Sequence, residues 1–420
     1  MRASRPKVLM VGPWPPAKGG VTTFMRNVTS SPLKEKYDFI PFTTSRPEKR
    51  DVKGDNYGYR AVFRGGFKRV AQGILITLWH LVAYPWVVML RRPTVIQVHA
   101  NDFQAFWEAS LYVLMGKIIR RPIVLRIGGA FNRFWESSGA TARIAIQWTL
   151  RQPSLLVVQS EYWKNYLSGL GRTGPTIILN NFVPEALLEK RTVPAPAVLR
   201  FLLYCGWAQK QKGAYVLLNA VRELVARDVK VDVTLMAVTN SLRDEFAMAG
   251  LDGHVRMLDF LSHDEALATL RRTDVFLQIS SSEGFPNMLL EAMALGCSAI
   301  VTPVGAVPEV VGADGECAFI IRAGDAAMLA DRMIRLAADR KLLARMAAVA
   351  QERIVERFTE QMAVQELDHA YQWAMQSGPR KQGIGVFGVT GRPVIVPTPT
   401  DCGVGNRMKP DESEALNRFQ

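Results

Sequence analysis

The residues of this 420-residue chain that are best suited to chemistry lie at positions 280–296. The pattern predicts a buried strand that ends at Ile279, a small polar loop, and a helix that Pro286 opens as its first residue. Such a loop presents Glu283 and unpaired helix N–H groups to one space, with Glu291 in the early turns. This set suits a polyol joined to a diphosphate. On two glutamates alone, a surface acidic loop followed by a core helix would be the simpler interpretation.

The full string resembles the E-x7-E signature of the retaining glycosyltransferases of family 4, because Glu291 stands eight positions after Glu283. The resemblance implies that Glu283 contacts the transferred sugar and that Glu291 contacts the ribose of a nucleotide donor. It also implies backbone contacts near the sugar from Phe285, Pro286 and Asn287. Further along, the run Val-Gly-Ala-Val-Pro-Glu at 304–309 is similar to the family's V-G-G-x-P-E turn.

Two other segments resemble the family's phosphate site. Lys212 precedes a glycine as in the family's Lys-Gly pair, where the lysine neutralises the donor phosphates, but Trp207 stands where an arginine is expected. Lys210 could replace that arginine only as a point charge, without a bidentate fork. Gly19 and Gly20 are similar to the family's Gly-Gly pair, where the backbone and the next helix N-terminus receive the leaving diphosphate.

The resemblance also implies acceptor-side residues in the N-terminal half. His99 follows a core strand and could position a hydroxyl or assist proton transfer, or serve as a structural histidine, and Asp102 follows it. Many relatives have His-Gly-Gly in the next stretch, where this chain has Ile127 or Gly128 at the histidine position, depending on the alignment. This departure leaves reduced or altered activity open. Arg126 and Arg133, in the same stretch, are expected to meet an anionic acceptor.

No Asp-x-Asp pair follows a strand in a place that would hold an octahedral metal. The positive phosphate site would then consist of Lys212, backbone amides and helix termini. We therefore expect metal-independent catalysis with a nucleotide-diphosphate sugar as co-substrate, no metal and no other cofactor. A G-x-G-x-x-G fingerprint is also missing, which disfavours a nicotinamide cofactor.

The elements that must position these residues alternate between strands and helices, which predicts α/β architecture with parallel sheets covered on both faces. A Pro- and Ala-rich stretch at 189–200 suits a linker, after which the alternation restarts. The family resemblance implies a GT-B fold of two Rossmann-like doubly wound domains around an interdomain cleft. We expect an acceptor domain at 1–190, a nucleotide-sugar domain at 191–357, a helix returning to the first domain at 358–377, and a disordered tail at 378–420.

The net charge of +14 is unevenly placed, because residues 1–200 hold 29 Lys and Arg against 11 Asp and Glu. A basic N-terminal half points to a phosphorylated acceptor, an anionic membrane surface or nucleic acid, unless it is only solvated surface charge. Nucleic acid is not expected, since no recognition motif accompanies the charge.

One apolar segment, from Gly73 to Leu90, barely reaches the length of a membrane span. His80 and Pro85 interrupt it, and a strand-like stretch follows directly. A buried helix that leads into a core strand, or a helix that contacts a membrane, is therefore expected in preference to a true span.

The first apolar run, Val8 to Val11, is too short for the core of a signal peptide. The four cysteines lie far apart and lack metal-ligand or redox spacing, which favours reduced thiols. The expected location is the cytoplasm, with peripheral attachment at the inner face of the plasma membrane as an option.

The function that the resemblance implies is retaining transfer of a sugar from a nucleotide-diphosphate donor to a saccharide or lipid-linked saccharide, in polysaccharide or glycolipid biosynthesis. Two alternatives stay open. One is a GT-B nucleotide-sugar epimerase. The other is a non-catalytic sugar-nucleotide-binding protein, which Trp207 and the missing histidine at Ile127 motivate.

Overall fold

The computed structural model describes residues 4–15, 17, 19–45, 66–101, 103–188, 196–206 and 208–377, with the backbone only at 66–70. These residues up to Ser377 belong to one compact unit. Asp102 and Trp207 lie outside the described residues. The same holds for the expected tail at 378–420 and for residues 189–195, where the boundary between the two predicted domains falls.

The first sheet has six parallel strands in the order β2-β1-β3-β4-β5-β6. Its strands are β1 (Lys7–Gly12), β2 (Asp38–Thr43), β3 (Val95–Ala100), β4 (Ile123–Ile127), β5 (Leu155–Val158) and β6 (Thr176–Ile178). Nearly every residue of β1, β3, β4 and β5 is buried, as expected of strands that helices cover on both faces.

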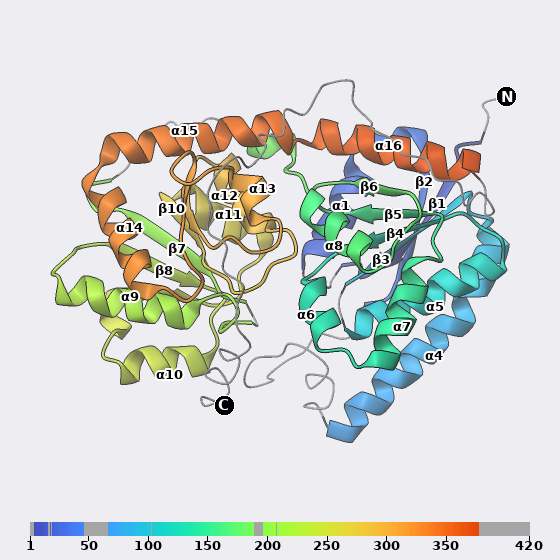
Figure 1. Ribbon diagram of the computed structural model, residues 1–420, viewed down its shortest axis with the longest axis horizontal. Coiled ribbons are helices and arrows are strands. Elements are labelled where there is room, and N and C mark those ends of the chain that lie inside the picture. Colours follow the sequence, from blue (N-terminus) through green and yellow to red (C-terminus); the bar gives the residue numbers. More distant parts are fainter. Residues whose placement is uncertain are drawn as a thin grey trace. The chain divides into compact units, whose positions relative to one another are not determined.

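Helices lie on both faces of this sheet (Figure 1). The N-terminal helices and short turns are α1 (Gly20–Ser30), α2 (Leu33–Lys36), α4 (Gly66–Arg91), α5 (Gln104–Ile118), α6 (Phe131–Glu136), α7 (Ala140–Leu150), α8 (Glu161–Gly169) and a 3₁₀ turn at Glu185–Leu187. Because side chains alternate along a strand, Val8 packs with α1 on one face, whereas Leu9 belongs to the core with α4 and α5 on the other.

The second sheet also has six parallel strands, in the order β12-β11-β10-β7-β8-β9. Its strands are β7 (Arg200–Tyr204), β8 (Asp232–Met236), β9 (Val255–Leu258), β10 (Val275–Gln278), β11 (Ser298–Val301) and β12 (Ala318–Ile320). Read from β9, this is the strand order 3-2-1-4-5-6 of a dinucleotide-binding Rossmann sheet. The predicted pair of doubly wound parallel sheets is confirmed.

The helices of the second half are α9 (Ala214–Ala226), α10 (Asn240–Met248), a 3₁₀ turn (Asp252–His254), α11 (His263–Arg271), α12 (Asn287–Ala294), α13 (Val307–Val311), α14 (Ala326–Ala338), α15 (Arg340–Arg357) and α16 (Glu360–Ser377). Helix α16 packs on the first sheet (Figure 1), where Leu367 and Tyr371 join the core formed by Val8 and Met10. Its Asp368 accepts from Lys36 Nζ and from Tyr37 Oη, both at 2.7 Å.

Each sheet reverses its winding at one place. In the first sheet this place lies between β1 and β3, and in the second it lies between β7 and β10. Loops that leave the carboxyl ends of such neighbouring strands run in opposite directions and leave a crevice, where ligands of these sheets bind. His99 lies at the end of β3, and the loops after β7 and β10 carry Lys212 and Glu283. Topology therefore assembles residues that are far apart in the sequence.

Helix α4 differs from the buried helix that was one expectation for residues 73–90. It leads into β3, yet only 11% of its apolar window at Ala71–Arg91 is buried, and by length and composition alone it could cross a membrane. Tyr84 and Val88 on one side are fully buried, while Trp79 and Trp86 on the other are 69% and 62% exposed. Because α4 is apolar on both sides, its sequence does not reveal which side is buried and which is exposed.

Candidate active site

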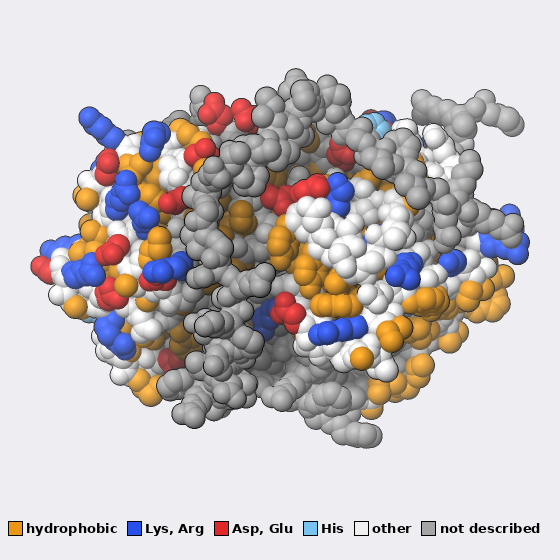
Figure 2. Space-filling view, in the orientation of Figure 1, with side chains coloured by type: hydrophobic (Ala, Val, Ile, Leu, Met, Phe, Trp, Pro, Cys, Tyr) orange, Lys and Arg blue, Asp and Glu red, His pale blue; other side chains and the backbone are white. Residues whose placement is uncertain are grey.

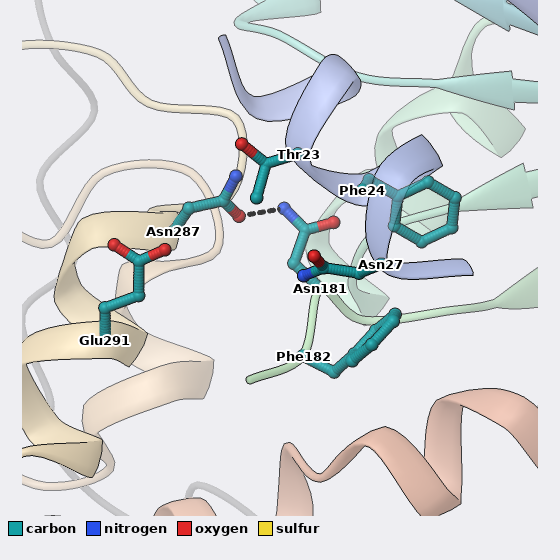
Figure 3. Close-up of a pocket in the computed structure, with 7 residues that line it drawn as sticks. All are labelled: Thr23, Phe24, Asn27, Asn181, Phe182, Asn287 and Glu291. Carbon is teal, nitrogen blue, oxygen red and sulfur yellow. Dashed lines mark hydrogen bonds between the residues drawn. The ribbon is translucent and has the colours of Figure 1, made fainter. Parts of the chain in front are cut away.

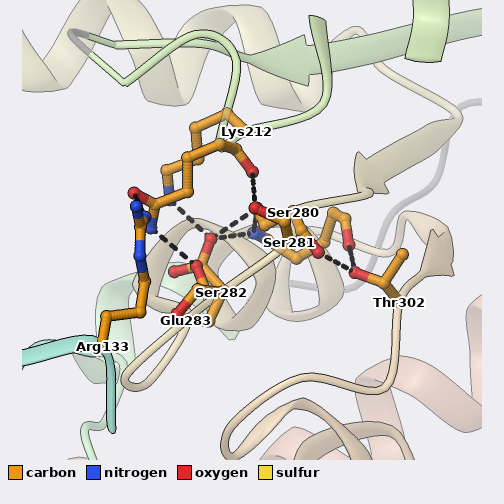
Figure 4. A network of polar contacts seen from close by, with 9 residues as sticks. Arg133, Lys212, Ser280, Ser281, Ser282, Glu283 and Thr302 are labelled. Atoms are coloured by element: carbon orange, nitrogen blue, oxygen red, sulfur yellow. Dashed lines mark hydrogen bonds and ion pairs between the residues drawn. The ribbon is translucent and has the colours of Figure 1, made fainter. Parts of the chain in front are cut away.

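Glu283 is the centre of a polar network after β10 (Figure 4). Its Oε1 accepts from Lys212 Nζ, from Gln278 Nε2 and from Ser280 Oγ, each at 2.6 Å. The Glu283 residue is 9% exposed, and the Lys212 side chain is 24% exposed. Among the described residues all three contacts fall on Oε1, which leaves Oε2 for a ligand hydroxyl. The arrangement holds a carboxylate and an ammonium side by side at the crevice.

The loop that carries Glu283 is held from two directions. Gln211 donates from Nε2 to the Ser282 carbonyl at 2.9 Å, and its own carbonyl accepts from Ser281 N at 2.8 Å. From the other sheet, Arg133 Nη1 on α6 donates to Gln211 Oε1 at 2.6 Å. The structure thus places Arg133, expected on the acceptor side, against the loop that supports the predicted donor residues.

Two glycines permit backbone contacts that a side chain would block. Gly213 has φ +88°, and a Cβ there would lie 2.4 Å from the Ile279 carbonyl oxygen. A Cβ on Gly284 would lie 2.5 Å from the carbonyl oxygen of Gly129, which follows β4 in the first sheet. Gly213 therefore sets Lys212 beside the end of β10, and Gly284 lets the Glu283 loop meet the first sheet's loops backbone to backbone.

Glu291 lines a small pocket between α12 and α1 (Figure 3), with Thr23, Phe24, Asn27, Asn181, Phe182 and Asn287. Asn181 Nδ2 donates to Asn287 Oδ1 across this pocket. A Cβ on Gly20 would lie 2.7 Å from Asn287 Nδ2, so the start of α1 meets the start of α12 closely. Gly19, at φ +142°, is the residue before α1. The two expected donor segments are thus neighbours in space.

The start of α12 differs slightly from the expectation. The helix begins at Asn287, and Pro286 precedes it at φ −87° and ψ 87°, outside helical geometry. Phe285 is 8% exposed and packs edge to face on Phe358, with ring centroids 6.1 Å apart. Pro286 thus ends the loop instead of opening the helix.

Burial raises the pKa of Glu291 to about 7, although the positive charge of Arg26 lowers it by a smaller amount. His263 Nε2 lies 3.8 Å from Glu291 Oε1, and burial lowers the pKa of this histidine. Glu291 therefore titrates near neutral pH and His263 below it. The folded protein therefore holds the Glu291 proton more tightly than the unfolded chain does. The contribution of this proton to the free energy of unfolding is full below pH 4.5 and is lost as the pH rises through the folded-state pKa of about 7.

This titration predicts a pH dependence of donor binding. If the ionised Glu291 carboxylate accepts from ribose hydroxyls, the affinity for a nucleotide sugar should rise about tenfold from pH 6 to pH 8, as the ionised fraction grows. Calorimetric titrations at several pH values measure this, since the diphosphate diester of the donor does not titrate in that range. Glu291→Gln should abolish the rise, and His263→Gln should keep it. An equal rise in Glu291→Gln would show that another group is responsible.

His99 and Arg126 are buried beneath this pocket. His99 Nε2 lies 2.9 Å from Gln97 Nε2, and burial, with the charge of Arg126, lowers the His99 pKa well below 6.5. Arg126 is 2% exposed, its guanidinium lies 3.8 Å from the Phe24 ring centroid, and its Nη2 donates to Asn181 Oδ1. Burial also lowers the Arg126 pKa to about 9.

Arg126 thus lies in the interior, not on a surface where it would meet an acceptor directly. Through Asn181 it reaches Asn287 at the start of α12. His99 is a neutral imidazole whose Nδ1 is buried and lacks a hydrogen-bond partner among the described residues. Both side chains are placed to shape the first sheet's half of the crevice.

Sequence reasoning missed several residues that join the two halves. The Glu309 carboxylate accepts from Glu161 N at 2.9 Å and from Tyr162 N at 2.6 Å, and so caps the N-terminus of α8. Trp163 Nε1 donates to the Gly284 carbonyl at 2.8 Å. The 304–309 run drew attention to Glu309, but no local pattern reveals a partner almost 150 positions away.

A search of the described residues for groups of three or more His, Cys, Asp or Glu side chains that could hold a metal found none. The cysteines that the structure describes, Cys205, Cys297 and Cys317, are free and buried. The positive charge nearest Glu283 is Lys212.

Comparison with known proteins finds similarity in the second half of the chain. Residues 200–339 match the family model of "Glycosyl transferases group 1". The chain is 28% identical over 173 residues to the D-inositol 3-phosphate glycosyltransferase of Corynebacterium efficiens. The aligned part covers 39% of this chain and 41% of that protein. It is also 28% identical over 232 residues to the putative colanic acid biosynthesis glycosyltransferase WcaL of Escherichia coli. That alignment covers 53% of this chain and 57% of WcaL. The chain thus spans about half the length of these curated relatives.

A solved structure covers more of the chain. HepE of Anabaena, in complex with UDP-glucose, superposes on 87% of this chain and 99% of its own with a TM-score of 0.65, at 15% sequence identity. That likeness shows the fold, and the expected GT-B architecture is confirmed.

Proposed function

We propose that the chain, whose residues 200–339 match the family model of group 1 glycosyl transferases, is a retaining glycosyltransferase. It would move a sugar from a nucleotide-diphosphate donor to a saccharide or lipid-linked saccharide in polysaccharide or glycolipid biosynthesis. The observation that carries the proposal is the Lys212–Glu283 contact of 2.6 Å at the carboxyl ends of β7 and β10. An ammonium beside a carboxylate at that crevice suits a sugar joined to a diphosphate.

The donor's parts map onto neighbouring groups. In this proposal Lys212 and the N-terminal amides of α1 hold the diphosphate, Glu283 accepts from sugar hydroxyls, and Glu291 accepts from the ribose. Asn287, which stands between the two glutamates in the sequence, lines the same pocket as Glu291. The UDP-glucose complex of HepE supports a nucleotide sugar as donor for a chain of this fold.

The reaction then needs little covalent chemistry from the protein. Lys212 and helix amides stabilise the charge on the leaving diphosphate, and the acceptor hydroxyl attacks from the same face, with the phosphate taking its proton. Glu283 lies where a carboxylate stabilises positive charge that develops on the sugar ring. His99, neutral and buried, positions the acceptor side. Because Lys212 supplies the positive charge, we propose that no metal is required, so activity should survive a chelator.

The acceptor is proposed to be anionic. Residues 1–200 carry 29 Lys and Arg against 11 Asp and Glu, so the half that faces the acceptor is strongly basic. The relative from Corynebacterium efficiens is named for a phosphorylated acceptor, inositol 3-phosphate. A saccharide that carries phosphate, free or lipid-linked, at the cytoplasmic face of a membrane fits this charge.

The proposal is tested in two steps. Thermal unfolding is measured with a panel of nucleotide sugars, since a donor present at 100 times its Kd stabilises the fold by about 2.7 kcal/mol. The donor so found is then incubated with phosphorylated and neutral saccharide acceptors, and NMR reads the anomeric configuration of the product. A product with the donor's anomeric configuration supports retention, and an inverted anomer would refute it. A free epimerised sugar nucleotide would show the epimerase instead, and binding without turnover would show a non-catalytic protein.

A further inference from the structure

Helix α4 presents an apolar face that none of the other described residues covers. Its inner side packs into the first sheet's core, where Tyr84 is fully buried and donates from Oη to the Tyr112 carbonyl at 3.1 Å. Its outer side carries six large apolar residues that are 53–77% exposed and that we call the outer stripe: Leu75, Leu78, Trp79, Val82, Trp86 and Leu90. Apart from the adjacent pair Leu78 and Trp79, they follow one another in steps of three and four, which places them along one side of the helix over about four turns.

The outer stripe continues onto the neighbouring helix. Ile118 and Leu111 of α5, which packs against α4, are 78% and 40% exposed. Figure 2 shows hydrophobic side chains gathered over the part of the molecule where Figure 1 places α4. Contiguous apolar surface of this extent is unusual on a soluble monomer and marks an interaction site.

In the sequence, the charges that flank the outer stripe are of one sign. The sequence has no Asp or Glu between Asp55 and Asp102. Arg91 and Arg92 end α4 just before β3, and Arg120 and Arg121 end the α5 region just before β4. Because β3 and β4 are adjacent parallel strands, these four arginines lie at one edge of the sheet, beside the end of the stripe. Glu108 of α5, on the neighbouring helix, is turned inward with its side chain 11% exposed.

We propose that the outer stripe of α4 docks in the plane of an anionic lipid surface. Aliphatic side chains and two tryptophans would enter the headgroup region, while the four arginines would meet lipid phosphates. A transmembrane orientation is disfavoured because α4 would have to leave the sheet and uncover Tyr112 and Phe42, which pack on Tyr84 with ring centroids 5.0 and 5.5 Å away. The inference does not rest on the proposed function, since lipid binding is measured without any sugar.

The experiment is co-sedimentation of the full chain with vesicles of phosphatidylcholine alone or with 30% phosphatidylglycerol. We expect binding to the anionic vesicles, and about a tenfold or larger loss of partitioning in Trp79→Ser/Trp86→Ser. The double variant Arg91→Gln/Arg92→Gln should bind anionic vesicles more weakly, by about fivefold for each arginine removed. Its binding to vesicles of phosphatidylcholine alone should not change. Met248→Ser on α10 is the matched control, because Met248 is 80% exposed and lies in the other half of the chain.

Unchanged thermal unfolding of the variants would show that the fold is intact. Equal vesicle binding by the wild type and Trp79→Ser/Trp86→Ser would overturn the proposal. A second result would also overturn it: the wild type binds no vesicles and is a dimer, and the tryptophan variant is a monomer. The outer stripe would then be covered by a second copy of the chain. Resistance of membrane-bound chain to extraction by alkaline carbonate would overturn in-plane docking in favour of a span.

Discussion

Replacing Glu283 by Gln is expected to lower kcat/KM for sugar transfer by about 10²- to 10⁴-fold while leaving donor binding measurable. The substitution keeps the shape of the side chain and removes its charge. Glu283 Oε1 is the common acceptor for Lys212, Gln278 and Ser280. A neutral amide oxygen can still accept from Gln278 and Ser280, but it cannot stabilise positive charge on the reacting sugar. The loss should therefore fall mainly on kcat.

The measurement is initial rates of transfer with the donor found by thermal shift, for the wild type, Glu283→Gln and a matched control. Glu352→Gln on α15 is that control, since it makes the same chemical change at an exposed position outside the crevice. Full activity in Glu283→Gln would remove Glu283 from the catalytic machinery. Complete loss of donor binding in that variant would assign it to affinity instead of to the chemical step.

Much of this arrangement could be predicted from sequence because it depends on local patterns. Short apolar runs marked most of the strands, although not β2 and β9, and the spacing of Glu283 and Glu291 marked the donor loop. The order of the strands then accounts for why Lys212 and Glu283 meet, since β7 and β10 are neighbours at the point where the winding reverses.

What could not be predicted depends on contacts between distant segments. Asn181 follows β6 in a stretch with no motif, yet it connects Arg126 to Asn287. Arg126 itself lies in an apolar strand, where a single charge gives no sign of whether it faces solvent or the interior. The same limit applies to α4, because a helix that is apolar on both sides has a sequence compatible with burial, with docking and with spanning.

Replacing Lys212 by Ala is expected to weaken nucleotide-sugar binding by about 10- to 100-fold, the value of one charge-assisted hydrogen bond of 1.5–3 kcal/mol. In the structure, the Lys212 ammonium contacts Glu283. Its side chain is only partly buried, so it can turn to the diphosphate when a donor enters. Because an ammonium needs no bidentate geometry, Lys212→Arg should retain part of the affinity.

Lys210→Ala is the matched control, because Lys210 is exposed in the same loop and is the other candidate for the phosphate contact. A larger loss in Lys210→Ala than in Lys212→Ala would move the phosphate site to Lys210. Calorimetry on Lys212→Ala, Glu283→Gln and the double variant completes the test. If the two side chains form one unit, their effects on donor affinity will not add, because each single variant already breaks the contact between them. Additive effects would mean that the 2.6 Å contact between Lys212 and Glu283 plays no part in donor affinity.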